Sequence, residues 1–487
     1  MKNLKDILYK VAITKVFGTT NVAVKNLVFD SRKIENEDIF IAQKGVSVDG
    51  HLYINKAIDL GATVIVCEDF PETQKDEITY VQVVDANTAL AVMASNFYDN
   101  PSSKIPLIGV TGTNGKTTIA SLLYQLFKKA GYKVGLLSTV KVLVDDVEFK
   151  ATHTTPDSIT INGYLDKMID AGVDFCFMEV SSHGIHQKRT EGLVFTGGIF
   201  TNLSHDHLDY HQTFAEYRNV KKEFFDGLPK SAFALTNIDD KNGNFMLQNT
   251  QAKKKTYALK TLADFKVKIL EKQLSGTLIS VDGTEVWTKL IGVFNIYNLT
   301  AIIATAELLG LEKLETLTII SELESVSGRF EYVISEDGIT AIIDYAHTPD
   351  ALKNVLETIN DIRTGNEKVI TVVGCGGDRD QTKRPKMAHI ASQLSSQAIF
   401  TSDNPRTENP QTILDEMEVG VASENYRKTL TVLDRRQAIK TACKLSEAGD
   451  IILIAGKGHE DYQEINGVRA HFDDLEEVKN CFNQLKN

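Results

Sequence analysis

The chain has few cysteines, no long apolar run and no excess of positive charge. The five cysteines include no CxxC pair, which argues against a disulfide framework or a cysteine-based zinc site. No apolar run approaches the roughly 18 residues that span a bilayer, and the first residues lack an apolar core of signal-peptide length. The cysteines are Cys67, Cys176, Cys375, Cys443 and Cys481.

Lysine and arginine number 53 against 65 aspartates and glutamates, a formal net charge of −12. A chain this acidic is not expected to bind nucleic acid or an anionic membrane surface. With 42% hydrophobic and 24% charged residues the composition is that of a globular protein and excludes wholesale disorder. We therefore expect a reduced, cytoplasmic protein without membrane insertion.

Short apolar runs alternate with helical patterns along the chain. Ile105–Val110, Lys368–Val373 and Asp450–Ala455 are such runs. Short β-branched runs between helical stretches are typical of parallel strands joined by crossover helices, so the predicted fold class is α/β. The stretch Lys253–Leu290 differs, with short alternating strands around a Ser-Gly and an Asp-Gly turn, and indicates an antiparallel excursion.

The length of 487 residues suggests about three domains. Asn100–Pro106 is polar, carries two prolines and reads as a linker. A second boundary is expected near Ser325–Arg329, between a helical pattern and a fresh set of strands. The predicted domains are residues 1–101, 102–329 and 330–487.

A strand, a glycine-rich loop and a helix follow one another from residue 105 to residue 130. Glycines let backbone N–H groups converge on phosphate oxygens, and a helix N-terminus favours negative charge. Lys116 is expected to pair with the β- and γ-phosphates of a nucleotide, and the Thr117 hydroxyl to hold Mg²⁺. The predicted nucleotide-binding residues here are Gly112, Thr113, Asn114, Gly115, Lys116, Thr117 and Thr118.

The loop departs from the strict G-x-x-x-x-G-K-[ST] pattern, because Val110 stands where that pattern has glycine. The alternative is an ordinary strand–turn–helix with a chance Gly-Lys-Thr. We favour the nucleotide site because strand, loop, lysine, threonine and helix all occur in register. A phosphate loop alone does not separate a kinase, a motor, a switch and a ligase.

Acidic and histidine residues follow the next apolar strands. Glu179 ends an apolar run, at the position where an acid after a phosphate loop can meet the metal. Residues 205–211 hold three histidines and two aspartates, for which a solvated polar loop is the alternative. Tyr217–Phe225 is predicted to be helical, and from composition alone its Lys221 and Lys222 would be solvated.

Taken together, these stretches resemble the Mur ligase family, ATP-dependent amide ligases of peptidoglycan precursor synthesis. The matching motifs extend nearly the length of the chain. They are Gly112–Thr118, Glu179–His183, Asp206–His211, Gly292–Asn298, Gly328–Arg329, Asp344–Asp350, Gly374–Arg379, Asp403–Arg406 and Gly456–Gln463. The resemblance implies an N-terminal domain that binds the UDP end of the substrate, a central phosphate-loop ATPase and a C-terminal Rossmann-like domain that brings the incoming amino acid.

The resemblance also assigns roles that the residues alone do not. It implies that Lys221, four residues after Tyr217, is carbamylated and serves as an anionic oxygen ligand, although Val220 stands where alanine is usual. The expected Mg²⁺ ligands are Thr117, Glu179, His207 and carbamylated Lys221, and the expected catalytic residues are Lys116, Glu179, His207 and Lys221. Further ATP contacts are expected from Asn298, at the adenine, and from Asp344 and His347.

For the UDP-linked substrate, the residues that match family contacts fall into two groups. Contacts to the nucleotide diphosphate are expected from Phe29, Ser31 and Gly45. Contacts to the muramoyl-dipeptide are expected from Thr154, Thr155, Ser181, Gln187 and Arg189. His153 stands where a related member has asparagine, which leaves its role open.

The tetrapeptide Asp403-Asn404-Pro405-Arg406 resembles that of family members that add meso-diaminopimelate as the third peptide residue. Diaminopimelate carries a distal carboxylate that lysine lacks, and a guanidinium can hold it in a bidentate pair. Arg379, Gly456 and Glu460 complete the expected pocket. Taken alone, the tetrapeptide could be a simple turn after the strand Ala398–Thr401.

The expected reaction phosphorylates the D-glutamate γ-carboxylate of UDP-N-acetylmuramoyl-L-alanyl-D-glutamate with ATP, and the amine of diaminopimelate then displaces phosphate. The expected cofactor is Mg²⁺ and the expected state is a monomer. Alternatives are the same step with L-lysine, another Mur or folylpolyglutamate-type ligase, a phosphate-loop switch or motor, and a catalytically silent scaffold.

Overall fold

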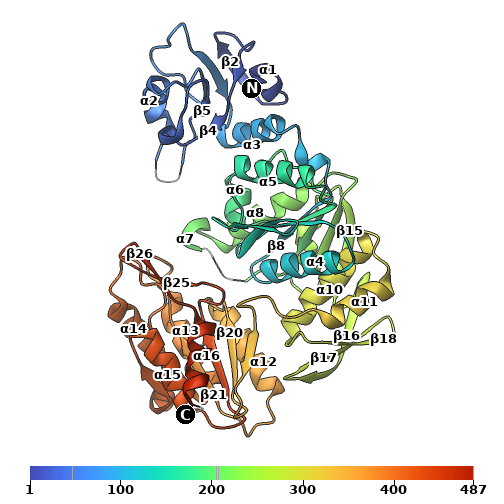
Figure 1. Ribbon diagram of the computed structural model, residues 1–487, viewed down its shortest axis with the longest axis vertical. Coiled ribbons are helices and arrows are strands. Elements are labelled where there is room, and N and C mark those ends of the chain that lie inside the picture. The colour runs from blue at the N-terminus through green and yellow to red at the C-terminus, as the bar shows by residue number, and fades with distance from the viewer. Residues whose placement is uncertain (46–47, 205, 207, 486–487) are drawn as a thin grey trace.

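Three large β-sheets follow one another along the described part of the chain, each flanked by helices (Figure 1). The computed structural model describes residues 1–45, 48–204, 206 and 208–485. Within those residues, no helix combines the length and the apolar character that crossing a bilayer requires. The fold is thus α/β with three domains, as the sequence predicts.

The N-terminal sheet has the strand order β2-β7-β6-β5-β4, with β2 antiparallel and the others parallel. Its strands are β2 (Ile13–Phe17), β4 (Leu27–Val28), β5 (Ile39–Ile41), β6 (Val64–Cys67) and β7 (Thr79–Val83). The other elements of this region are β1 (Lys2–Asn3), α1 (Leu4–Ile7), β3 (Ala23–Val24), α2 (Ile54–Asp59) and α3 (Ala86–Phe97). All four residues of β6 are buried, which is typical of a strand covered on both faces.

The central sheet has the order β11-β10-β9-β12-β8-β13-β14-β15-β16-β17-β18. The seven strands from β9 to β16 in this order run parallel. At each edge two further strands, β10 and β11 at one and β17 and β18 at the other, pair antiparallel. The strands are β8 (Leu107–Thr111), β9 (Val134–Leu137), β10 (Lys141–Val144), β11 (Val147–Lys150), β12 (Phe175–Glu179), β13 (Gly197–Phe200), β14 (Phe233–Asn237), β15 (Lys253–Ala258), β16 (Phe265–Gln273), β17 (Gly276–Val281) and β18 (Thr284–Thr288).

Helices cover both faces of the central sheet. One core packs against α4 (Lys116–Lys129), α10 (Val293–Leu308) and α11 (Lys313–Glu322), and the other against α5 (Ser158–Asp170) and α8 (Phe214–Asp226). Shorter helices are α6 (Ser182–His186), α7 (Leu208–His211) and α9 (Gly243–Met246). Alternate residues of β8 enter opposite cores, Leu107 one and Ile108 the other, as the period of a strand requires.

The predicted antiparallel excursion is correct for β16, β17 and β18 and wrong for β15. The Ser275-Gly276 and Asp282-Gly283 turns join the antiparallel strands, but β15 pairs in parallel with β14. The reason is burial: Tyr257 and Ala258 at the end of β15 are buried and extend the parallel core.

The C-terminal sheet has the order β19-β20-β24-β21-β22-β23, parallel except for β19. Its strands are β19 (Glu331–Ile334), β20 (Thr340–Asp344), β21 (Val369–Val373), β22 (Gln397–Phe400), β23 (Thr429–Thr431) and β24 (Ile451–Ala455). The flanking helices are α12 (Pro349–Ile362), α13 (Lys383–Leu394), α14 (Pro410–Glu418), α15 (Arg435–Leu445) and α16 (Asp474–Leu485). A separate hairpin consists of β25 (Tyr462–Ile465) and β26 (Val468–His471).

The strands predicted at 105–110, 368–373 and 450–455 correspond to β8, β21 and β24, each within two residues of the expected bounds. All five cysteines are buried and unpaired. The central and C-terminal sheets meet through Ile291 and Leu274, which pack into the core of the C-terminal sheet. An ion pair of 3.3 Å between Lys272 and Asp361 crosses the same junction.

Candidate active site

The glycine-rich loop lies between the end of β8 and the start of α4. Gly112 and Gly115 adopt positive φ angles of 148° and 90°, which allow the chain to turn tightly into the helix. The side chain of Lys116 folds back over the loop, and its Nζ donates to the main-chain oxygens of Gly112 (3.1 Å) and Thr113 (2.9 Å). Burial lowers the pKa of the Lys116 amine.

The segment after β13 holds this loop in place. A Cβ on Gly112 would collide with Thr201 Oγ1. Thr113 N donates to the Asn202 main-chain oxygen (2.8 Å), and Asn114 N donates to Asn202 Oδ1 (3.0 Å). Sequence reasoning missed Thr201 and Asn202. Their signal is their position directly after β13, which neighbours β8 in parallel, so that both strands end at one edge.

Lys221 lies beneath the loop, on the inner face of α8, and is 1% exposed. Its Nζ donates to the Gly112 main-chain oxygen (2.9 Å), the same atom that accepts from Lys116. Burial, reinforced by the positive charge of Lys116, holds the pKa of the Lys221 amine well below its ordinary value. The expectation of a solvated Lys221 is therefore wrong, because the spacing of four from buried Tyr217 places both on one helix face.

Lys222 is also buried, contrary to the expectation from composition. Its ammonium is paired with Asp226 one turn later, at 2.6 Å. Arg218 and Lys222 both lie over the ring of Phe245, which covers this side of the helix. The positive charge of Lys222 is thus paired within α8. Lys221 differs, because its amine bonds to the glycine-rich loop.

Glu179, at the end of β12, is fully buried and faces the start of α4. Its carboxylate accepts from Thr117 Oγ1 (2.9 Å) and from Thr139 N (2.7 Å). A carboxylate and a hydroxyl oxygen are the hard ligands that Mg²⁺ prefers, so this pair fits a magnesium ion. His207 lies outside the described residues, and within those residues no group of three or more His, Cys, Asp or Glu is placed to hold a metal.

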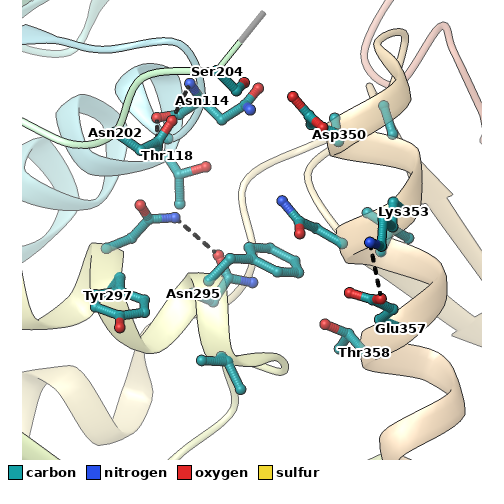
Figure 2. Close-up of a pocket in the computed structure, with 18 of the residues that line it drawn as sticks. Asn114, Thr118, Asn202, Ser204, Asn295, Tyr297, Asp350, Lys353, Glu357 and Thr358 are labelled. Atoms are coloured by element: carbon teal, nitrogen blue, oxygen red, sulfur yellow. Dashed lines mark hydrogen bonds and ion pairs between the residues drawn. The ribbon is translucent and has the colours of Figure 1, made fainter. Parts of the chain in front are cut away.

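A cavity of about 700 Å³ separates the central and C-terminal domains (Figure 2). Figure 2 shows Asn114, Thr118, Asn295 and Tyr297 on the central side. Facing them, from α12, are Asp350, Lys353, Glu357 and Thr358. Both domains therefore contribute side chains to one polar pocket that adjoins the glycine-rich loop.

Asn298 lies where the pocket meets the loop. Its Oδ1 would be 2.5 Å from a Cβ on Gly115, and its Nδ2 donates to Asn295 Oδ1 (3.3 Å). On the same wall the Tyr297 hydroxyl donates to Asp239 (2.8 Å). Burial alone would raise the pKa of Asp239, but hydrogen bonds from Thr261 and neighbouring main-chain N–H groups hold it below its ordinary value.

Asp344 and His347 line the C-terminal side of the cavity, at the end of β20. Burial raises the pKa of Asp344 to about 6, and its carboxylate accepts from Phe330 N (2.7 Å). Burial lowers the pKa of His347 to about 4. Arg329 connects the domains, because its Nη2 donates to Thr117 Oγ1 (3.2 Å) while its guanidinium lies 4.5 Å from the centre of the Tyr345 ring.

A second cluster forms behind Glu179, toward the N-terminal domain. Thr155 Oγ1 donates to the Glu179 main-chain oxygen (2.9 Å) and accepts from Ser181 N (2.9 Å). Arg189 donates to the Thr155 main-chain oxygen and to Gln187 Oε1, both at 2.6 Å. The structure thus brings together four of the five residues expected to bind the muramoyl-dipeptide.

The remaining residues predicted for the UDP-linked substrate lie around this cluster and beyond it. Thr154 Oγ1 accepts from Thr139 Oγ1 (3.0 Å), next to the Glu179 carboxylate. His153 is exposed, with Nδ1 3.3 Å from Thr152 Oγ1. Phe29 and Gly45 belong to loops of the N-terminal sheet, and Ser31 begins the short 3-10 helix Ser31–Lys33. Phe29 is 39% exposed and Ser31 is buried.

The Asp403–Arg406 turn follows β22 at the carboxyl edge of the C-terminal sheet. Asn404 Nδ2 donates to Glu460 Oε2 (2.7 Å), and Arg406 Nη1 donates to the Gly377 main-chain oxygen (2.7 Å). A Cβ on Gly456 would lie 2.7 Å from Asp403 Oδ2. The turn, Gly456 and Glu460 therefore form one cluster.

Neighbouring loops and buried charges surround that turn. A Cβ on Gly377 would strike the Pro405 main-chain oxygen, and Arg379 on the same loop is exposed. Fully buried Lys457 donates to Glu460 Oε2 (3.3 Å). Burial would raise the pKa of Asp403, but Lys457 and Arg435 hold it below its ordinary value. Sequence reasoning missed Lys457 and Arg435, whose charge gives no sign of burial.

Three family models match successive parts of the chain. They are the Mur ligase family, catalytic domain, over residues 23–98, the Mur ligase middle domain over residues 110–306, and the Mur ligase, glutamate ligase domain over residues 328–458. Together they cover most of the 487 residues.

Curated relatives match at full length. The UDP-N-acetylmuramoyl-L-alanyl-D-glutamate–2,6-diaminopimelate ligase of Cytophaga hutchinsonii is 56% identical over 483 residues, 99% of each chain. The ligase of the same name from Phocaeicola vulgatus is 51% identical over 98% of this chain and 99% of its own. A solved structure of a ligase with that name is 31% identical, with a TM-score of 0.70 over 100% of this chain and 99% of that one. The chain belongs to the Mur ligase family.

Proposed function

We propose that this protein joins meso-2,6-diaminopimelate to the D-glutamate γ-carboxylate of UDP-N-acetylmuramoyl-L-alanyl-D-glutamate, at the expense of ATP. The observation that carries the proposal is the match over nearly the full length to relatives named for this reaction, at 51–56% identity. ATP and nucleotide-linked precursors are cytoplasmic metabolites, so we place the reaction in the cytoplasm. We expect a monomer, which light scattering of the purified protein tests.

The choice of amino acid is supported by the Asp403–Arg406 turn. Arg406 donates to the Gly377 main-chain oxygen, and the Glu460 carboxylate accepts from Asn404, two residues before Arg406 in the same turn. A guanidinium can take the distal carboxylate of diaminopimelate, and a carboxylate can take its distal ammonium. L-Lysine would leave the guanidinium without a counter-charge, which gives discrimination.

The chemistry has two steps. An oxygen of the substrate γ-carboxylate attacks the γ-phosphorus of ATP and ADP leaves, which forms an acyl phosphate. The amine of diaminopimelate, after losing a proton, attacks the acyl carbon, and the carbon–oxygen bond to phosphate breaks. The glycine-rich loop and Lys116 bind and orient the phosphates, and closure of the C-terminal domain onto the central domain would exclude water that hydrolyses the acyl phosphate.

The buried oxygens of Thr117 and Glu179 are suited to Mg²⁺, and we propose two ions. One would be held by Thr117, and a second by Glu179, His207 and carbamylated Lys221. When bound, the ions would neutralise charge on the phosphates and on the acceptor carboxylate. Lys221 is suited to carbamylation because burial favours its neutral amine. That amine can add to CO₂, forming a nitrogen–carbon bond and releasing one proton.

The test is a product assay. Purified protein is incubated with ATP, Mg²⁺, the UDP-muramoyl-dipeptide and meso-diaminopimelate, and we expect ADP together with a UDP-muramoyl-tripeptide by mass spectrometry. Replacing Lys221 with alanine should remove the product. Turnover with L-lysine in place of diaminopimelate would overturn the amino-acid assignment, and ADP release that no acceptor stimulates would favour a nucleotide switch or motor instead.

A further inference from the structure

The backbone of Arg406 lies in the left-handed region, with a φ of 52°. A residue with a Cβ adopts this conformation at a cost in free energy, so the surrounding structure must impose it. Arg406 is also the residue whose guanidinium we assign to the amino-acid substrate. What holds its backbone therefore decides where that guanidinium lies.

One constraint comes from the neighbouring loop after β21. Gly377 N donates to the Asn404 main-chain oxygen (2.9 Å), and Arg406 Nη1 donates to the Gly377 main-chain oxygen (2.7 Å). These two bonds attach the turn to the sheet on one side. They leave the N–H and C=O of Arg406 itself to be bonded from elsewhere.

The hairpin β25–β26 supplies those bonds. Arg406 N donates to the Glu464 main-chain oxygen (3.0 Å), and Asn466 N donates to the Arg406 main-chain oxygen (2.6 Å). Glu464 N also donates to Asn404 Oδ1 (2.9 Å). Gln463 Nε2 donates to the main-chain oxygen of Asp403 (2.7 Å), so one side chain of the hairpin fixes the start of the turn.

The hairpin itself contributes little to the hydrophobic core. All four residues of β26 are exposed, and Ile465 and Val468 are 45% and 70% exposed. An element that buries so little apolar surface adds little to global stability through packing. Its described bonds to the Asp403–Arg406 turn are then its main link to the rest of the domain.

Resting on the proposed function, we propose that the hairpin β25–β26 is a specificity element of the amino-acid site, in which Gln463 is a positioning residue. Gln463 acts by holding the main chain at Asp403, while Glu464 and Asn466 hold Arg406 in its left-handed conformation. The guanidinium is thereby presented at one place for the distal carboxylate of diaminopimelate. A loosened hairpin leaves that guanidinium without a fixed position. Amino-acid binding is then weakened more than nucleotide binding.

The test uses Gln463→Met, which keeps the length of the side chain and removes the amide donor. The loss of one such hydrogen bond corresponds to a rise of about threefold to tenfold in KM for diaminopimelate. We expect kcat and the KM for ATP to stay within about twofold of the unaltered enzyme, since neither Gln463 nor Asp403 is among the residues that line the pocket beside the phosphate loop. Gln463→Glu places a carboxylate, which can only accept, next to the Asp403 main-chain oxygen. It should raise the KM for diaminopimelate at least as much as Gln463→Met.

A double-mutant cycle separates positioning from general stability. In an Arg406→Lys background, Gln463→Met should change KM for diaminopimelate by less than about twofold, because the group that it positions is already altered. The matched control is Asn360→Leu, which removes an amide that donates to the Leu356 and Leu394 main-chain oxygens (2.9 Å each). We expect that control to lower the Tm and leave KM for diaminopimelate unchanged.

Several results would overturn the proposal. They are an unchanged KM for diaminopimelate in Gln463→Met, an equal rise of this KM in both arginine backgrounds, and a parallel rise of the KM for ATP. Failure of the unaltered enzyme to turn over diaminopimelate at all would instead remove the proposed function, and with it this inference. The two failures are therefore distinguishable in one set of assays.

Discussion

At the scale of single residues, the site is defined by charged groups that have been taken out of water. Lys116 and Lys221 direct their amines at one carbonyl oxygen, that of Gly112, and Glu179 is fully buried behind them. Buried ionisable groups with shifted pKa values are typical of functional sites. Composition cannot reveal such burial, which is why composition alone predicts a solvated Lys221.

Asp344 gives a prediction about pH. Its folded-state pKa of about 6 lies above the ordinary value of 3.8, so the folded state holds a proton that the unfolded chain has released between these values. The stabilising contribution is complete below pH 3.8 and is lost as the pH rises through about 6. Replacing Asp344 with asparagine should therefore raise the free energy of unfolding above this pKa, by about 1–3 kcal/mol.

The measurement is denaturant unfolding of the unaltered protein and the variant at several pH values. The gain should shrink as the pH falls toward 3.8, where both side chains are neutral. Equal stability differences at every pH would contradict the assignment. The control is Asp282→Asn, an exposed aspartate in the β17–β18 turn that is paired with Lys313 and is not among the residues lining the cavity.

At the scale of elements, two glycines with positive φ angles lie on either side of α4 and can be compared. Gly112, before the helix, has a φ of 148°, and Gly131, after the helix, has a φ of 90°. A Cβ on Gly112 would strike Thr201 Oγ1 and approach the Asn202 main chain to 3.0 Å, whereas a Cβ on Gly131 would meet nothing within 4 Å. The backbone strain is shared, but the collision is not.

We therefore expect Gly112→Ala to lower ATP affinity by at least about tenfold, because the loop must move away from the position that its N–H groups need. Gly131→Ala should destabilise the protein by about 1 kcal/mol through its φ angle and leave ATP affinity unchanged. Calorimetric titration with a non-hydrolysable ATP analogue measures both. A loss of affinity in both variants would show that strain, not the collision, is responsible.

The sequence predicted where strands and helices lie better than it predicted which strands pair and in which direction. The strands β8, β21 and β24 and the helices α4 and α8 could be read from apolar runs and periodicity, because these patterns are local. The parallel pairing of β15 could not, since it depends on a neighbouring strand and on the burial of Tyr257. The loop, Glu179 and the Asp403–Arg406 turn were found from motifs, whereas Asn202 and Arg435 act through contacts distant in sequence.

At the scale of the whole molecule, the pocket beside the glycine-rich loop, where we propose that ATP binds, belongs to two domains. Residues of α10 line one wall and residues of α12 the other (Figure 2). Arg329, just before β19, donates to Thr117 Oγ1 in the central domain. A ligand that contacts both walls stabilises both domains. We therefore expect an ATP analogue to raise the unfolding temperature of the central and the C-terminal domain together.

At a ligand concentration of 100 times Kd the added stability is about 2.7 kcal/mol. Hydrogen exchange with mass spectrometry resolves the domains, and we expect slower exchange in α4 and in α12 with nucleotide bound. The N-terminal sheet, none of whose described residues lines the cavity, serves as the internal control. Protection confined to α4 would contradict a pocket shared between the domains.

The burial of every native cysteine has a practical consequence. A thiol introduced on the exposed side of α12 would react with a maleimide dye far sooner than the five enclosed ones. A second dye on the central domain would then report the distance between the two by energy transfer, in single molecules during turnover.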